Sequence, residues 1–402
     1  MKTTAARYII IGAIVLVLAG LFGVYYFLKH ANTQTALDSA ARGYNAPQPS
    51  FDGSVGSTYE NEVSTLGLTE NQSASSTQRL WHVTVVPIAG FGWVSTSSPS
   101  LYFVERSSGY VYDANTANRG VARLSNTLRP QVYNAIVSLQ GSVVEQSLDQ
   151  NGAVITFAGS IATSTASSTS ELQGAILSAP SAIALDPSTQ TLFYLSPSAS
   201  GVSLVSSAWS GTKAKTLYTF SLAGWRIYAG SGGILLSQKA ADGLDGYAYS
   251  LQGGALSLVA EGPGLTVLPK NGAWPLLVGE SDSQTIALFY ELGATSAAQK
   301  LSIQTVPEKC AWMPGEGAIA YCGVPQIAPK GTFLDDWYKG LVHTSDIIWQ
   351  VDVSIGSTSI LYSPLSENLS LDVVDPQVDP TGNYLAFING VDDSLWVLKL
   401  EQ

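Results

Sequence analysis

Residues 379–389 read DPTGNYLAFIN, a short polar turn followed by a run of apolar residues. Similar phrases occur three more times, as DPSTQTLFYL from Asp186, PKNGAWPLLVG from Pro269 and PGEGAIAYCG from Pro314. Pro, Gly and Asn favour tight turns, and a short apolar run after such a turn is typical of a buried β-strand. The repetition therefore predicts one β-sheet unit that the chain uses several times.

Seven such units follow one another at intervals of about 40 to 60 residues, which is the spacing of four-stranded propeller blades. The last unit has only three strands before the chain ends at Gln402. The segment RLWHVTVV, from Arg79 to Val86, is predicted to supply the fourth strand and to close the ring. Two stacked β-sandwiches are the alternative fold, but they give no reason for the missing strand. The predicted units open at Gly90, Gln131, Ala179, Gly224, Gly264, Lys309 and Leu371.

These repeated phrases, together with LDDWYKG and SDIIWQVDV in the sixth unit, give residues 79–402 a resemblance to known propellers. The chain resembles the WD40-like and TolB-type β-propellers, and more narrowly bacterial propellers carried on one N-terminal membrane span. The Gly-His and Trp-Asp pairs of WD40 repeats are missing. The resemblance implies an all-β, seven-bladed propeller that acts as a platform for other macromolecules.

The N-terminal part of the chain predicts a membrane anchor and a tether. Twenty-one uncharged residues run from Tyr8 to Leu28, enough for a helix to cross the hydrocarbon layer of a bilayer. Lys2 and Arg7 precede the span, which favours a cytoplasmic N-terminus and a propeller outside the membrane. A cleaved signal peptide is the alternative, but its apolar region is usually shorter. The predicted domains are a tail and signal anchor at 1–30, a flexible Ser/Thr/Asn-rich linker at 31–78, and the propeller at 79–402.

The composition excludes several classes of function. The chain is 12% charged and 46% hydrophobic, and 19 Lys and Arg against 30 Asp and Glu give a net charge of −11. Such an acidic chain is not expected to bind a nucleic-acid backbone. With three His, two Cys and two Met, we expect neither a metal site nor a cofactor.

The strongest functional candidate is an insertion between the second and third strands of the sixth unit, from Val324 to Ile347, because long loops on a rigid scaffold commonly carry binding. Apart from binding, the insertion could be a plug that covers the blade or the central channel. A protein of the cell envelope or of a surface appendage is the favoured partner, and a cell-wall or surface glycan is the alternative. The candidate partner-binding residues are Asp335, Asp336, Trp337, Tyr338, Lys339 and His343.

Catalysis is a third and weaker hypothesis. His343 lies near Asp335, Asp336, Asp346 and Ser345 in the sequence, which sketches a Ser-His-Asp arrangement. No G-x-S-x-G phrase accompanies it, so we assign no catalytic residues and predict a non-enzymatic protein. The same carboxylates lack the alternating pattern of a calcium loop.

The two cysteines are predicted to form a disulfide bond. Cys310 and Cys322 flank CAWMPGEGAIAYC, and a hairpin that turns at Gly315 to Gly317 places them directly opposite each other. Opposed residues of an antiparallel pair lie close enough for a disulfide, and the predicted location outside the cytoplasm permits oxidation. Two buried free thiols are the alternative.

Overall fold

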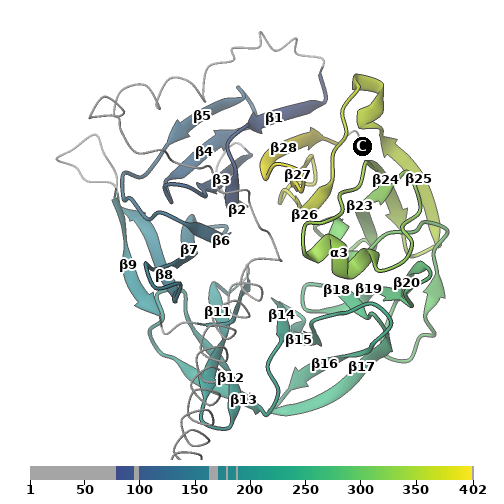
Figure 1. Ribbon diagram of the computed structural model, residues 1–402, viewed down its shortest axis with the longest axis horizontal. Coiled ribbons are helices and arrows are strands. Elements are labelled where there is room, and N and C mark those ends of the chain that lie inside the picture. The colour runs from purple at the N-terminus through teal and green to yellow at the C-terminus, as the bar shows by residue number, and fades with distance from the viewer. Residues whose placement is uncertain (1–77, 95–98, 163–170, 178–179, 187–188, 401–402) are drawn as a thin grey trace, which may run out of the picture.

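Seven four-stranded antiparallel sheets are arranged in a ring around a central axis in the computed structural model (Figure 1). The structure describes residues 78–94, 99–162, 171–177, 180–186 and 189–400. The prediction of an all-β, seven-bladed propeller is confirmed, and the described residues contain very little helix.

Every predicted unit corresponds to one blade. Strand order follows the sequence in blades one to six, whereas in blade seven β1 lies next to β28. Blade one comprises β2 (Ile88–Val94), β3 (Ser100–Glu105), β4 (Val111–Asn115) and β5 (Gly120–Arg123). Blade two comprises β6 (Val132–Val137), β7 (Ser142–Leu148), β8 (Val154–Ala162) and β9 (Glu171–Leu177). Blade three comprises β10 (Ala182–Asp186), β11 (Thr191–Ser198), β12 (Gly201–Ala208) and β13 (Lys215–Phe220). Blades four and five comprise β14 (Trp225–Gly230), β15 (Gly233–Gln238), β16 (Asp245–Gln252) and β17 (Ala255–Pro263), then β18 (Thr266–Lys270), β19 (Ala273–Ser281), β20 (Ile286–Glu291) and β21 (Gln299–Lys300). Blade six comprises β22 (Cys310–Trp312), β23 (Ile319–Pro325), β24 (Asp346–Asp352) and β25 (Ser357–Tyr362), and blade seven β26 (Val373–Val378), β27 (Tyr384–Asn389), β28 (Ser394–Lys399) and β1 (Leu80–Thr84).

The core lies between neighbouring blades, because a sheet in this ring is covered on both faces and its strands need no regular polar alternation. Phe387 and Leu398 of blade seven pack with Ile348 of blade six, and all three side chains are fully buried. Leu204 of blade three and Leu236 of blade four form an equivalent contact. Burial on both faces explains why inner strands such as β2 and β27 are almost continuous runs of apolar residues.

The ring is closed as predicted by the strand that precedes the first blade. β1 pairs antiparallel with β28, with Leu80 opposite Leu398 and Trp81 opposite Val397. The ring of His82 stacks on Trp396 with 3.9 Å between ring centroids. The first described strand and the last strand therefore belong to one sheet, which joins the two ends of the propeller.

The predicted disulfide is present. Cys310 on β22 is the register partner of Cys322 on β23, with 4.0 Å between their Cα atoms, and the structure bonds their sulfur atoms. Both residues are buried. The bond joins the innermost two strands of blade six.

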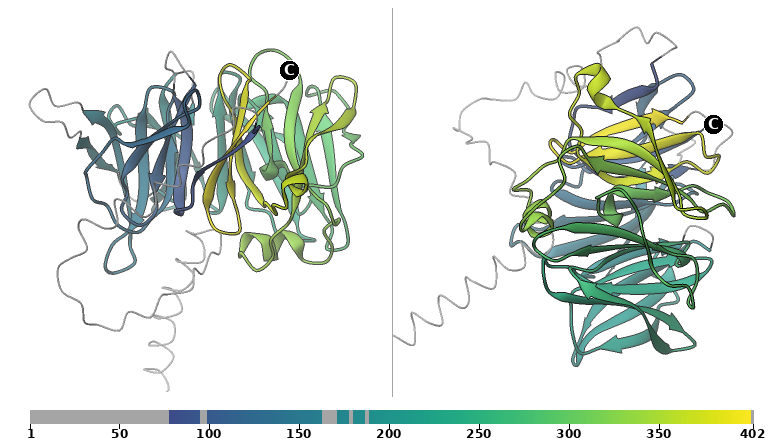
Figure 2. Two further views of the ribbon diagram at one scale, coloured as in Figure 1. Left: turned by 90° about the horizontal axis from the view of Figure 1, so that it is seen from above. Right: turned by 90° about the vertical axis from the view of Figure 1, so that its right-hand side faces the viewer.

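The two faces of the ring differ in what they carry. Loops between second and third strands lie on one face, and the insertion of blade six is one of them, so we call this the insertion face. β1 begins at the opposite face, where the Lys399 N–H donates to the Arg79 carbonyl at 2.9 Å. Figure 2 shows the insertion helix at one face and the C-terminal end at the other. The chain therefore enters the propeller at the face remote from the insertion.

The predicted anchor between Tyr8 and Leu28, and the predicted linker up to residue 77, lie outside the described residues. Among the helices that are described, none is long and apolar enough to cross a bilayer.

Candidate functional site

The insertion leaves blade six after β23 and returns at β24, so it comprises residues 326–345, slightly fewer than expected. It contains a helix that the sequence analysis did not predict, α3 (Phe333–Tyr338). Phe333 and Trp337 are four residues apart, as are Leu334 and Tyr338, so all four side chains fall on one face and are buried. That spacing was the available sequence signal, but it extends over less than two turns. Two further single-turn helices, η1 (Pro307–Lys309) and η2 (Pro364–Glu367), occur outside the insertion.

Trp337 and Tyr338 each have only 7% of their surface exposed. They join a core cluster that includes Val374 and Ile388 of blade seven. The two aromatic side chains therefore attach the insertion to the propeller, which agrees with the plug interpretation of this segment.

A fully buried lysine fixes the base of the insertion. The Lys309 ammonium donates to Asp346 Oδ2 at 2.7 Å and also contacts a carboxylate oxygen of Asp372. The Trp337 indole N–H donates to Asp372 Oδ2 at 3.1 Å, and Lys309 Nζ lies 4.9 Å from the Trp337 ring centroid. Lys309 and both aspartates are at most 1% exposed, so these charges satisfy one another away from water.

The two aspartates respond differently to this environment. Burial raises the pKa of Asp346, although Lys309 opposes the shift. Burial also acts to raise the pKa of Asp372, but the charge of Lys309 and hydrogen bonds from Lys309, Thr344 and Trp337 outweigh it and lower that pKa. Of the two carboxylates, Asp372 is therefore the one that stays ionised to lower pH.

A second polar cluster connects the insertion to blade four. The Tyr338 hydroxyl donates to Glu308 Oε1, and Arg226 Nη1 lies 2.5 Å from the same oxygen. The Arg226 guanidinium carbon is 4.8 Å from the Tyr338 ring centroid. Burial raises the pKa of Tyr338 well above its ordinary value, so the hydroxyl keeps its proton and remains a donor. The contact joins β14, η1 and α3.

Asp335 and Asp336 have local partners. The Asp335 N–H donates to Asp242 Oδ2 at 2.9 Å, which ties α3 to the loop after β15. The Thr332 hydroxyl donates to Asp336 Oδ2 at 2.8 Å. Within the described ranges the structure contains no group of three or more His, Cys, Asp or Glu side chains arranged to hold a metal ion.

His343 approaches a carboxylate, but not one of its sequence neighbours. Its Nδ1 atom lies 3.2 Å from Asp372 Oδ2, and a third of the side chain is exposed. Asp346 is committed to Lys309, and the Ser345 hydroxyl accepts a hydrogen bond from Gln326 Nε2 at 2.8 Å. His343 and Asp372 line a cavity of about 50 Å³.

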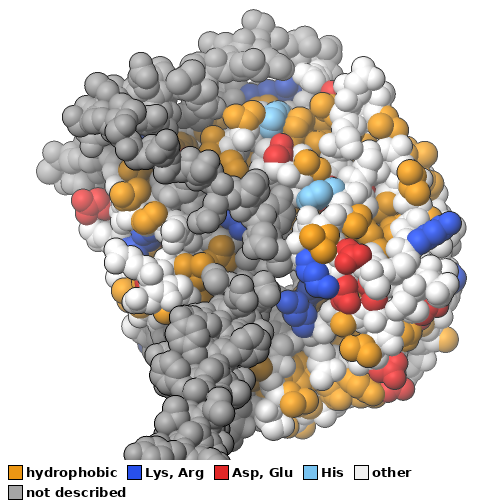
Figure 3. Space-filling model, viewed as in Figure 1, with side chains coloured by type: hydrophobic (Ala, Val, Ile, Leu, Met, Phe, Trp, Pro, Cys, Tyr) orange, Lys and Arg blue, Asp and Glu red, His pale blue; other side chains and the backbone are white. Residues whose placement is uncertain are grey.

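The exposed residues of the insertion are aliphatic and charged. Ile327 is 85% exposed, Leu341 is 70% exposed, and Val342, Lys339 and His343 are also exposed. Figure 3 shows hydrophobic and charged side chains mixed over the part of this face that is described. Of the six candidate binding residues, Lys339 and His343 are at the surface, Asp335 and Asp336 are half-buried, and Trp337 and Tyr338 are beneath them.

Sequence reasoning missed Arg226, Glu308, Lys309 and Asp372, which hold the insertion in place. Asp346 and Asp372 did leave one signal, because each stands at the start of an apolar strand segment, in SDIIW and LDVV. A charged residue at such a position is unusual unless it is paired. The sequence did not indicate that both face the same lysine.

No comparison with known proteins assigns this chain to a family. No protein-family model matches the sequence, and a search of curated proteins finds no match. Among solved structures, a chain of a mitotic checkpoint complex has 11% identity and a TM-score of 0.49, covering 89% of this chain and 100% of that one. Oligogalacturonate lyase from Vibrio parahaemolyticus has 9% identity and a TM-score of 0.44, covering 79% and 98% of the two chains.

Hydrazine synthase from Kuenenia stuttgartiensis has 12% identity and a TM-score of 0.48, covering 75% of this chain and 92% of that one. Likeness at this level concerns the fold and carries nothing about activity or partners. The class of protein that the strand pairing itself defines is the seven-bladed β-propeller.

Proposed function

We propose that this chain is a non-enzymatic, membrane-anchored interaction platform whose insertion face binds a protein of the cell envelope or of a surface appendage. The observation that carries the proposal is the exposure of Ile327 and Leu341 on a loop that the buried side chains of Trp337 and Tyr338 attach to the propeller. Exposed aliphatic side chains cost little to desolvate, and a fixed loop loses little entropy when it binds. The resemblance to WD40-like and TolB-type propellers supports the same function.

The exposed residues of the insertion favour a protein as the binding partner over a glycan. A glycan site would be expected to present flat aromatic rings at the surface, whereas Trp337 and Tyr338 are buried. The exposed groups are Ile327, Leu341 and Lys339, a mixture typical of protein interfaces. Trp337 and Tyr338 therefore contribute to binding by positioning the loop.

The place where the chain enters the propeller supports this use of the insertion face. The predicted tether reaches the propeller at Arg79, on the opposite face, as the contact of Arg79 with Lys399 places it. A flexible linker of about 48 residues has a root-mean-square reach of about 40 Å. A propeller anchored in this way can direct its insertion face away from the membrane, toward the wall or neighbouring proteins.

The test compares two surface substitutions in a cross-linking pull-down from the native envelope. Ile327→Asp combined with Leu341→Asp should lower capture of the partner at least tenfold without changing the melting temperature, because both side chains are at the surface. Ile355→Asp is the matched control, since Ile355 is 74% exposed in the turn between β24 and β25 on the opposite face. Equal capture by both variants would refute the proposal, and capture of polysaccharide in place of protein would favour the glycan alternative.

A further inference from the structure

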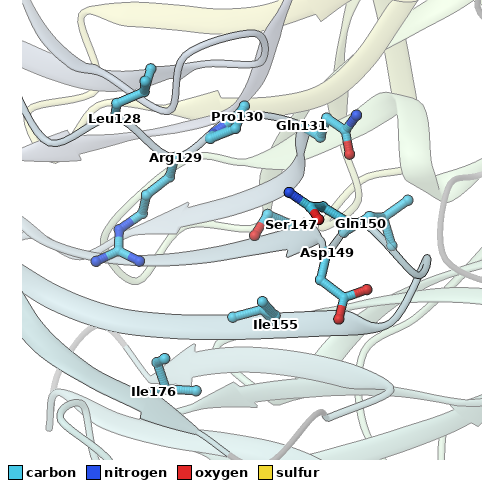
Figure 4. A pocket seen from close by; sticks show the side chains of 10 residues that line it. Leu128, Arg129, Pro130, Gln131, Ser147, Asp149, Gln150, Ile155 and Ile176 are labelled. Carbon is cyan, nitrogen blue, oxygen red and sulfur yellow. The ribbon is translucent and has the colours of Figure 1, made fainter.

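A pocket of about 420 Å³ opens on blade two, and it involves no residue of the insertion. The loop between blades one and two forms one wall, and the turn between β7 and β8 forms another (Figure 4). Both loops belong to the insertion face, because the turn joins second and third strands. The volume lies within the range of pockets that hold small ligands or single peptide residues.

Several of the side chains that line this pocket are apolar, and two of them are largely exposed to solvent. Leu128 of the inter-blade loop is 64% exposed, and Ile176 of the outermost strand β9 is 69% exposed. Ile155 of β8 also lines the pocket and is half-buried. Exposed branched side chains that gather around a hollow provide apolar area for a ligand group to cover.

Arg129 supplies a positive charge at the pocket. Its guanidinium carbon stacks 3.4 Å from the centroid of the Phe157 ring, which fixes its position. Its Nε atom lies 3.6 Å from Glu145 Oε2, longer than a hydrogen bond, and has no hydrogen-bond partner among the described residues. This nitrogen faces Glu145, and the charge and planar shape of the guanidinium suit it to a carboxylate.

Glu145 lies beneath Arg129 and is almost fully enclosed. Its side chain is 1% exposed, and neither carboxyl oxygen has a hydrogen-bond partner in the described part of the chain. Burial raises the pKa of Glu145 to about 7, with Arg129 opposing the shift. Its register neighbours, Ala135 on β6 and Phe157 on β8, carry no charge. Glu145 can therefore take up a proton when another anion forms an ion pair with Arg129.

Asp149 supplies a hydrogen-bond acceptor from the opposite wall. Its Oδ1 atom accepts the backbone N–H groups of Asn151 and Ala153, each at 2.8 Å, which holds the side chain in place. These hydrogen bonds lower the pKa of Asp149, so it is ionised at neutral pH. The pocket thus offers a cation, an apolar hollow and a fixed anion.

We propose that this pocket binds the C-terminal residue of a peptide chain whose last side chain is a branched apolar one. The terminal carboxylate pairs with Arg129, and the side chain covers Ile155 and Ile176. Such a chain end carries the carboxylate and the apolar side chain on one residue. The site is separate from the insertion, so it can fail or succeed independently of the proposed function.

The experiment measures binding of N-acetyl-leucine to the full chain in detergent micelles by ligand-observed NMR. N-acetyl-leucinamide, which lacks the carboxylate, and acetate, which lacks the apolar group, should each bind at least tenfold more weakly. Arg129→Gln should lower the affinity for N-acetyl-leucine at least tenfold. Arg123→Gln is the control, because Arg123 is exposed on the neighbouring strand β5, and it should bind like the unsubstituted chain.

Two further measurements keep the proposal testable if Arg129→Gln does not fold. Ile176→Asp changes an exposed side chain and should also lower the affinity at least tenfold. In the unsubstituted chain the affinity should rise as the pH falls from 8 to 6, and Glu145→Gln should abolish this dependence while binding is kept. Equal affinity for the acid and the amide, or no loss with Ile176→Asp, would overturn the proposal.

Discussion

Glu145→Gln is predicted to make the propeller more stable at alkaline pH and to remove a pH dependence. The folded pKa of Glu145 is about 7, against an ordinary value of 4.5. Because the folded value is raised, the protonated side chain contributes its full stability below pH 4.5, and that contribution is lost as the pH rises through about 7. The shift corresponds to about 3 kcal/mol at pH 8, at about 1.36 kcal/mol per pKa unit.

The assay is urea unfolding of the propeller, residues 78–402, followed by tryptophan fluorescence at pH 5 and pH 8. The unsubstituted protein should lose up to about 3 kcal/mol of unfolding free energy across this interval relative to Glu145→Gln. A glutamine keeps the shape of the protonated acid, so the two proteins should be similar at pH 5. Glu261→Gln, at an exposed position of β17, is the control. Equal pH dependence for Glu145→Gln and the unsubstituted protein would show that ionisation of the buried carboxyl does not lower the unfolding free energy at alkaline pH.

Three other predictions concern the fold and its location. Replacing both Cys310 and Cys322 with Ala should lower the unfolding free energy by about 3 kcal/mol in the chain-entropy model, and non-reducing mass spectrometry should find no free thiol in the unsubstituted protein. Deleting residues 79–86 should expose the edge of β28 and cause association detectable by light scattering, whereas deleting residues 31–70 should not. Protease added to intact cells should remove the propeller if the predicted anchor leaves it outside, and digestion only after lysis would contradict that orientation.

Much of the fold could be predicted because neighbouring segments of the chain form each blade. The phrase at residues 379–389 becomes the turn before β27 and the strand itself, since Tyr384 to Asn389 pair with the strands on either side. The missing strand of the last unit was enough to assign the closing role of β1, because an unpaired sheet edge is unfavourable. The disulfide followed from the symmetry of one hairpin, in which Cys310 and Cys322 are equally distant from the turn.

The candidate site could be predicted only in outline. The length and position of the insertion were readable, but the orientation of Trp337 and Tyr338 was not, because an aromatic pair suits burial as well as binding. Their partners are distant in sequence, with Trp337 and Asp372 separated by 35 residues and Tyr338 and Glu308 by 30. The neighbours of His343 in sequence suggested a different carboxylate from the one that it contacts.

The sequence by itself determined the number of blades and the cysteine pair, because these depend on contacts between consecutive segments with regular spacing. It also determined the closing strand, because the last unit was one strand short. Only the tertiary structure decided which side of the insertion is buried and which charged groups meet at Lys309. It also decided that Glu145 lies enclosed beneath Arg129. Such contacts join different blades, and their geometry is fixed when the ring closes and brings side chains from separate repeats into a dry interface, where each charge must find a partner or change its pKa.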